Sequence, residues 1–134
     1  MAPETRVGYV FNLADESTSG QHYHIVISEP DDLGKFAVVS LTDARYAPYA
    51  EVWRENYKLC ECVRLGKPSS VAARFAKILK QSDLEAKSAE FTCRCTAEAL
   101  RRARCNALKY VRYMEAEVRE HVSLHEAEWV GGCQ

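Results

Sequence analysis

The first part of the chain alternates short apolar, β-branched runs with polar segments, a pattern typical of antiparallel strands. Runs of this kind occupy residues 7–11, 19–28 and 35–42, and residues 12–19 predict a polar loop. Residues 29–34 contain Pro, two Asp and Gly, which form turns readily. They predict that the last two runs are adjacent strands of one antiparallel pair.

The middle of the chain gives weaker signals. Residues 57–65 alternate with period two and predict one strand. Residues 70–79 fit both a helical stripe and a strand face, and their length does not decide between the two. Residues 82–85 have the Ser-x-x-Glu form of a helix start, and residues 91–95 fit either a last short strand or an extended link.

The C-terminal segment predicts a helix that begins at Thr96, a suitable N-cap. No Gly or Pro occurs from there until Gly131, which would give one helix of ~33 residues and about 50 Å. Because this exceeds the diameter of a small domain, the helix must bend, break or project, and its apolar stripe needs a partner or a fold-back. The stripe consists of Leu100, Ala103, Ala107, Leu108, Val111, Met114, Val118 and Val122, with Trp129 at its end.

Composition indicates an ordered domain of modest size. The 134 residues suit one domain, and a hydrophobic content of 47% argues against disorder. A net charge of −1 gives no global attraction to nucleic acid. We expect no signal peptide, because no apolar run follows the first residues, and no membrane span, because no run of about 18 apolar residues occurs. We therefore expect a cytoplasmic protein whose six cysteines are reduced.

Cysteines and histidines offer candidate metal ligands. The pairs Cys60-x-Cys62 and Cys93-x-Cys95 together could form a four-thiolate zinc site. Within strands such thiols are far apart, however, and the intervals differ from those of zinc knuckles, which favours buried free thiols. The histidine pairs 22/24 and 121/125 each share a face, but neither lies in an established metal-binding pattern. We expect no metal and no cofactor.

The charges of the C-terminal segment are arranged against the helix dipole. Acids dominate its second half, whereas bases crowd its first half, although the dipole favours the reverse order. Antiparallel pairing of two copies would explain this arrangement, and so would a surface for nucleic-acid phosphates. A solvated helix with local ion pairs is the third interpretation. The basic residues are Arg101, Arg102, Arg104, Lys109 and Arg112.

The order of these elements resembles the PemK/MazF group, the toxins of toxin–antitoxin pairs. The resemblance rests on short apolar motifs and covers roughly residues 6–108. It implies an α+β fold, with a small SH3-like antiparallel β-barrel over residues 1–95 and a long C-terminal helix over residues 96–134 that packs on the barrel or on a partner. It also favours a strand for residues 71–79. The motifs are residues 7–11, a polar loop with Gly20, residues 25–28 and 38–42, Ser70-Val71 leading into residues 75–79, Leu84 and residues 96–100.

The resemblance implies a metal-independent endoribonuclease acting on single-stranded RNA. The family places an Arg where the first hairpin strand begins and a Thr where the second ends. Thr42 occupies the Thr position, whereas His22-Tyr23 stand in place of the family's Arg-Pro pair. A histidine can act as acid or base, and a threonine hydroxyl can donate to a phosphate oxygen. The candidate catalytic residues are therefore His22 and Thr42, with His24 orienting or assisting.

The family likeness further implies a homodimer and an antitoxin partner. A second hypothesis is a catalytically inactive barrel, phage- or plasmid-encoded, that binds or inhibits another protein through its long helix. The missing Arg and the near-zero net charge favour this alternative, whereas the strand order and Thr42 favour the nuclease.

Overall fold

The computed structural model describes residues 4–14, 21–47 and 49–133 of the chain. Its strands are β1 (Tyr9–Ala14), β2 (Gln21–Val26), β3 (Phe36–Asp43), β4 (Val52–Trp53), β5 (Lys58–Cys60), β6 (Val63–Arg64), β7 (Ser69–Val71), β8 (Lys77–Leu79) and β9 (Glu90–Arg94). Its α-helices are α1 (Gln81–Ala86), α2 (Ala97–Lys109), α3 (Ala116–Ser123) and α4 (Glu126–Trp129). Short 3-10 helices are η1 (Ala44–Tyr46), η2 (Ala73–Phe75), η3 (Val111–Tyr113) and η4 (Val130–Cys133).

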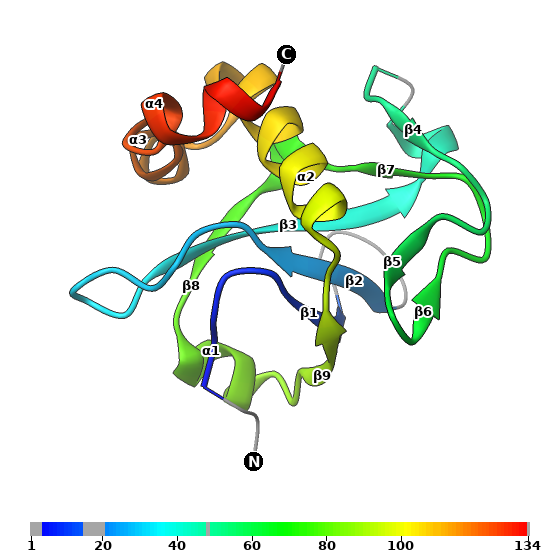
Figure 1. The fold of residues 1–134 in the computed structure, drawn as a ribbon. Helices are drawn as coiled ribbons and strands as arrows, with labels where there is room; N and C mark the ends of the chain where they lie inside the picture. Colours follow the sequence, from blue (N-terminus) through cyan, green and yellow to red (C-terminus); the bar gives the residue numbers. More distant parts are fainter. Residues whose placement is uncertain (1–3, 15–20, 48, 134) are drawn as a thin grey trace.

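The strands form one twisted antiparallel sheet and a separate hairpin (Figure 1). The sheet has the order β4-β7-β3-β2-β1-β9, and β8 also pairs with β3. Among the described strands no ladder joins the outer strands β4 and β9, so the sheet is open. The α+β class with an antiparallel sheet is confirmed, whereas a closed SH3-like barrel is not.

The central hairpin agrees with its prediction. Strands β2 and β3 are antiparallel, with Ile25 opposite Val39 and Val26 opposite Val38. Residues 15–20, which include most of the predicted loop and the start of the predicted first strand, lie outside the described part of the chain. The hairpin is therefore confirmed from Gln21 onward.

Two predicted strands are interrupted in the structure. Residues 57–65 were expected to form one strand, but they form the β5–β6 hairpin, whose turn contains Glu61 and Cys62. Alternation with period two does not reveal a turn in the middle of a segment. Residues 71–79 were expected to form one strand, but they hold only the last residue of β7, followed by η2 and β8, and the two short strands pair with different parts of β3. The predicted short helix near residue 82 is confirmed as α1, and of the two alternatives for residues 91–95 the structure shows the strand, as β9.

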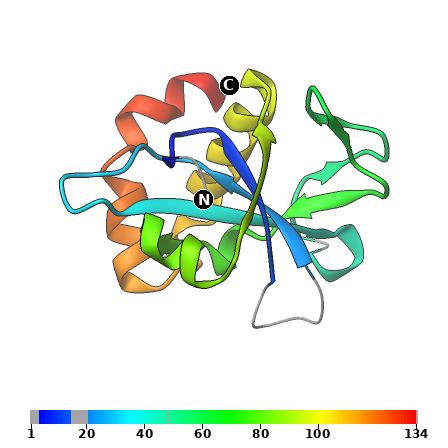
Figure 2. The same ribbon diagram turned by 90° about the horizontal axis from the view of Figure 1, so that it is seen from below.

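The C-terminal segment is not the one long helix that was predicted, and of the outcomes expected for a helix of that length, a break with a fold-back is the one observed. After α2 ends, Met114 and Glu115 adopt extended backbone angles, and α3 and α4 fold back beside α2 (Figures 1 and 2). This break brings Met114, Val118 and Val122 into the same hydrophobic cluster as Ala103. A straight helix would carry these later residues away from the sheet. The break is therefore set by packing rather than by a Gly or Pro.

Two apolar clusters lie on the two faces of the sheet. One is formed between the sheet and helices α2 to α4, and it includes Trp53, Val39 and Ala103. The other lies toward α1 and joins Phe11, Val26, Phe36, Val38, Leu79 and Leu84. Both faces of the central strands are consequently covered. No helix in the described residues has the length and apolar character needed to span a membrane.

The expectation of six reduced cysteines is wrong for four of them in this structure. Disulfides join Cys60 to Cys93 and Cys105 to Cys133, with Cα atoms 6.3 and 5.4 Å apart. The partners are 33 and 28 residues apart in sequence, so only the fold brings them together. The second disulfide holds η4 against α2.

The start of α2 provides a test of the local structure. Thr96 is the N-cap as predicted, and its hydroxyl oxygen accepts a hydrogen bond of 3.0 Å from the Ala99 amide. Replacing it by Ala leaves that amide without its partner, so Thr96→Ala should lower the free energy of unfolding by about 1 kcal/mol. Thr96→Ser keeps the oxygen and should remain close to wild type. Urea denaturation measures both, and equal loss in the two variants would contradict the cap.

Candidate active site

A hollow of about 810 Å³ lies where β2 begins and β3 ends. It is bordered by the end of the β2–β3 pair, by η1 and by the loop between β6 and β7. Two of the three predicted catalytic residues, His22 and Thr42, line it. The side chains that give it its chemical character are those of His22, Thr42, Asp43, Arg45, Tyr46 and Lys67.

The hairpin register explains why His22 and Thr42 meet. The β2–β3 ladder ends at the pair His24 and Ser40, so His22 and Thr42 each lie two residues beyond it at the same end of the hairpin. Both side chains line the hollow at that end. The start of one strand is therefore brought to the end of the other.

The His22 ring is held by the backbone of β3. Its Nδ1 lies 3.1 Å from the carbonyl oxygen of Leu41. Because a carbonyl oxygen only accepts, Nδ1 is the nitrogen that carries the proton in this bond. In a neutral ring the basic lone pair then belongs to Nε2. The half-buried Thr42 supplies a hydroxyl in the same hollow.

Two cations next to Thr42 were missed by the sequence reasoning. Arg45 Nη2 lies 3.0 Å from Asp43 Oδ2 and its Nε lies 3.1 Å from Oδ1, which is a two-point ion pair. Lys67 Nζ lies 3.5 Å from the same Oδ2. Two positive charges and one negative charge leave this group with a net charge of +1. The available sequence signal was the Asp43-x-Arg45 spacing directly after Thr42, whereas the family resemblance places a cation only at position 22.

The third candidate catalytic residue, His24, lies deeper in the sheet. His24 is only 3% exposed, and its Nδ1 lies 3.0 Å from the carbonyl oxygen of His22. It does not line the hollow. The structure thus places His24 behind His22 rather than beside it.

The predicted basic surface of the C-terminal segment does not border this hollow. Arg102 pairs with Glu51 at 3.0 Å and lies over the Trp53 ring. Arg104 donates to the Ile27 carbonyl oxygen, and its burial lowers the pKa of its guanidinium. The remaining basic residues of that surface are Arg101, Lys109 and Arg112, of which Arg101 and Lys109 line a different hollow.

That second hollow, of about 510 Å³, lies beside α2. Arg101, Arg102 and Lys109 line it, but so do Glu98 and Glu126. This surface is therefore of mixed charge rather than continuously basic.

Metal-ligand geometry occurs elsewhere in the molecule. Within the described ranges, the one group of at least three close His, Cys, Asp or Glu side chains is Cys60, Cys62 and Cys93. His121 and His125 have other contacts: His121 Nε2 lies 3.0 Å from the Ser28 hydroxyl, and the His125 ring stacks on Trp129. The hollow at His22 is not part of a metal-ligand group.

Comparisons with known proteins give a fold but no sequence family. No family model and no curated protein matches the chain. A chain in the crystal structure of MazE-MazF (Form-III) from Deinococcus radiodurans superposes with a TM-score of 0.55 and 18% identity, over 84% of this chain and 100% of that one. The chain has a MazF-like fold. The crystal structure of MazF (Form-I) from the same organism agrees, with a TM-score of 0.52 and 16% identity over 83% and 99% of the two chains.

The likeness confirms the family resemblance at the level of the fold, whereas the closed barrel and the single long C-terminal helix that it implied are not found in the described residues. At this level of identity the likeness is one of fold, and the chemistry of the hollow is read from its own residues.

The ion pair between Asp43 and Arg45 leads to a prediction for the pKa of Asp43. Hydrogen bonds from Arg45 hold the pKa of Asp43 at about 2, below its ordinary 3.8. Since the folded-state pKa is depressed, the stabilisation is present above pH 3.8 and is lost as the pH falls through about 2. We expect the NMR titration of the Asp43 carboxyl carbon to have its midpoint near 2.

Variants identify the cause of this depressed pKa. Arg45→Ala should raise the Asp43 midpoint toward 3.8, and Lys67→Ala should raise it less, because Arg45 contributes the hydrogen bonds. The exposed Arg119 of α3 provides the control, and Arg119→Ala should leave the midpoint unchanged. A wild-type midpoint near 3.8 would contradict the ion pair.

Proposed function

We propose that the protein is a MazF-like endoribonuclease that cleaves single-stranded RNA without a metal ion at the His22–Thr42 hollow. One observation carries this proposal: an imidazole, a hydroxyl and two cations meet in one hollow of a MazF-like fold. These are the group types that transesterification of RNA requires.

The reaction would use the 2′-hydroxyl of the RNA as nucleophile. His22 Nε2 takes the proton of that hydroxyl while O2′ attacks the adjacent phosphorus. The bond from phosphorus to the 5′ oxygen breaks, and the imidazolium formed returns a proton to the leaving oxygen. The products are a 2′,3′-cyclic phosphate and a 5′-hydroxyl, and no metal ion takes part.

Negative charge on the phosphate oxygens increases in the transition state, and the hollow offers donors for it. The Thr42 hydroxyl can donate to a non-bridging oxygen, and Arg45 and Lys67 supply positive charge. In this proposal the two cations take over the role of the Arg that the family has at the position of His22. Tyr46, which is 74% exposed, offers a ring on which an unpaired base can stack.

The proposal includes a protein partner, because a structural neighbour is MazE-MazF. We propose an antitoxin of this kind for the present chain, together with a homodimer and a cytoplasmic location. The alternative of an inactive docking module rested on the missing Arg, the near-zero net charge and a long helix whose apolar stripe needed a partner. Instead Ala103, Ala107 and Val122 of that stripe are buried in the chain's own core, so the stripe gives no support to the alternative.

Cleavage of a long single-stranded RNA in EDTA tests the chemistry. We expect discrete fragments that end in a 2′,3′-cyclic phosphate. His22→Ala should lower the rate by at least about 100-fold, since it removes the general base. Thr42→Val should lower it by about 10- to 100-fold, and Thr42→Ser should restore most of the activity because it retains the hydroxyl.

Matched variants outside the hollow separate this result from a loss of folding. His125→Ala and Thr92→Val remove a histidine and a hydroxyl from α3–α4 and from β9, and both should cleave like wild type. Cleavage that disappears in EDTA, or that persists in His22→Ala, would refute the mechanism. Intact RNA after incubation of wild type with total cellular RNA would also count against it.

Arg45 should act through the phosphates. Arg45→Ala should weaken binding of single-stranded RNA and reduce the slope of log Kd against log salt concentration by about 0.7, the value for one phosphate neutralised on a single strand. Fluorescence anisotropy over a series of salt concentrations measures both. Arg119→Ala removes an exposed charge away from the hollow and should change neither. Equal slopes for wild type and Arg45→Ala would exclude an interaction of Arg45 with a phosphate.

A further inference from the structure

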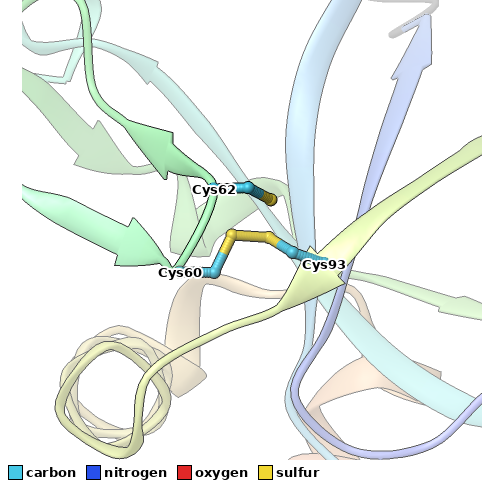
Figure 3. Close-up of side chains that lie close together, drawn as sticks. All are labelled: Cys60, Cys62 and Cys93. Atoms are coloured by element: carbon cyan, nitrogen blue, oxygen red, sulfur yellow. A yellow bond between two sulfur atoms is a disulfide. The ribbon is translucent and has the colours of Figure 1, made fainter.

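Three sulfur atoms lie together on the side of the sheet where β9 meets the β5–β6 hairpin. The Sγ atoms of Cys60, Cys62 and Cys93 are within 4.8 Å of one another. Figure 3 shows Cys60 at the end of β5, Cys62 in the hairpin turn and Cys93 on β9, with their sulfurs directed toward one another. The group draws ligands from two elements that are far apart in sequence.

The hairpin turn creates this cluster. On one extended strand, Cys60 and Cys62 would be too far apart for easy chelation, which is why the sequence favoured free thiols over a zinc site. Because the chain turns at Glu61 and Cys62, both sulfurs are directed toward β9. A β-bridge between Cys60 and Cys95 places the two segments side by side.

We propose that Cys60, Cys62 and Cys93 form a thiolate binding site for Zn²⁺ when the Cys60–Cys93 disulfide is reduced. A thiol reductant of the glutathione class opens the disulfide: the S–S bond accepts two electrons and two protons, and the reductant becomes its own disulfide. Three cysteine thiols then release three protons and bind one Zn²⁺ through three sulfurs. Water occupies the fourth position.

The geometry suits zinc. Tetrahedral Zn²⁺ with bonds of about 2.3 Å requires sulfurs about 3.8 Å apart. The three sulfurs already lie within 4.8 Å of one another, and reduction lets those of Cys60 and Cys93 separate to non-bonded contact. Cys60 and Cys93 are buried, whereas Cys62 is exposed and leaves a path for the ion and its water. Thiolate ligands select soft or borderline ions such as Zn²⁺ over Mg²⁺ and Ca²⁺.

A metal site would also give a role to Cys62, the cysteine of the cluster that the disulfide leaves free. The disulfide uses two of the sulfurs and leaves Cys62 with a weak contact of 3.7 Å from its Sγ to the Thr92 carbonyl oxygen. Zinc would engage all three and tie the β5–β6 hairpin, which forms its own two-stranded sheet, to β9. This proposal does not depend on the nuclease proposal, and its readout is metal binding.

The test uses the full chain with its disulfides reduced by a phosphine and its metal removed by a chelator. After dialysis against Zn²⁺, atomic absorption should find about one zinc per chain. Co²⁺ in place of Zn²⁺ should give the thiolate charge-transfer and visible bands of a tetrahedral site. Cys62→Ser leaves both disulfide pairs intact, yet it should weaken Zn²⁺ binding by at least about 10-fold.

Cys95→Ser is the matched control, because it removes the other free cysteine, which lies outside the cluster. It should bind zinc like wild type, and circular dichroism should show that both variants fold. If the reduced wild-type protein takes up no zinc, the proposed site is wrong. Equal binding by Cys62→Ser and wild type places the ion elsewhere, and equal loss in Cys95→Ser and Cys62→Ser shows that the ligand set is wrong.

Discussion

The rest of the structure depends on the pairing of β3. This strand, Phe36–Asp43, hydrogen-bonds to β2, β7 and β8, and its first six residues are buried. Such burial requires cover on both faces, which α2 to α4 provide on one side and α1 on the other. The last two residues, Thr42 and Asp43, are only half-buried. The hollow therefore lies where the central strand leaves the core.

The sequence predicts the elements whose signals are local. Residues 25–27 and 36–39 are continuous apolar runs, and a strand pair with both faces covered needs such runs. Thr96 could be assigned because an N-cap is a property of one residue and its neighbours. The break after Lys109 has no such signal, because it follows from the free energy gained when Val118 and Val122 reach the core. The disulfides likewise depend on which segments the fold brings together.

In the candidate site, too, the residues that depend on local pairing were predictable from the sequence, and the residue from a distant loop was not. His22 and Thr42 flank one hairpin, and antiparallel pairing alone brings its two outer ends together. Lys67 comes from another element: β3 and β7 pair Asp43 with Ser69, which carries the preceding loop to the hollow. No periodicity in the sequence indicates that pairing. Cations supplied by loops are therefore harder to predict than a residue on the hairpin itself.

The position of the cations changes what they can do. An Arg on β2 would be held by the sheet, whereas Arg45 lies in η1 and is held by Asp43. That carboxylate keeps its charge down to a pKa of about 2, so it orients Arg45 at every pH near neutrality. It takes two of the five guanidinium N–H donors, through Nε and Nη2, and it does not need the other three. Asp43 thus lowers the net charge of the hollow but fixes the direction in which Arg45 presents its remaining donors. A chain of net charge −1 can in this way offer a phosphate one ordered, locally positive site.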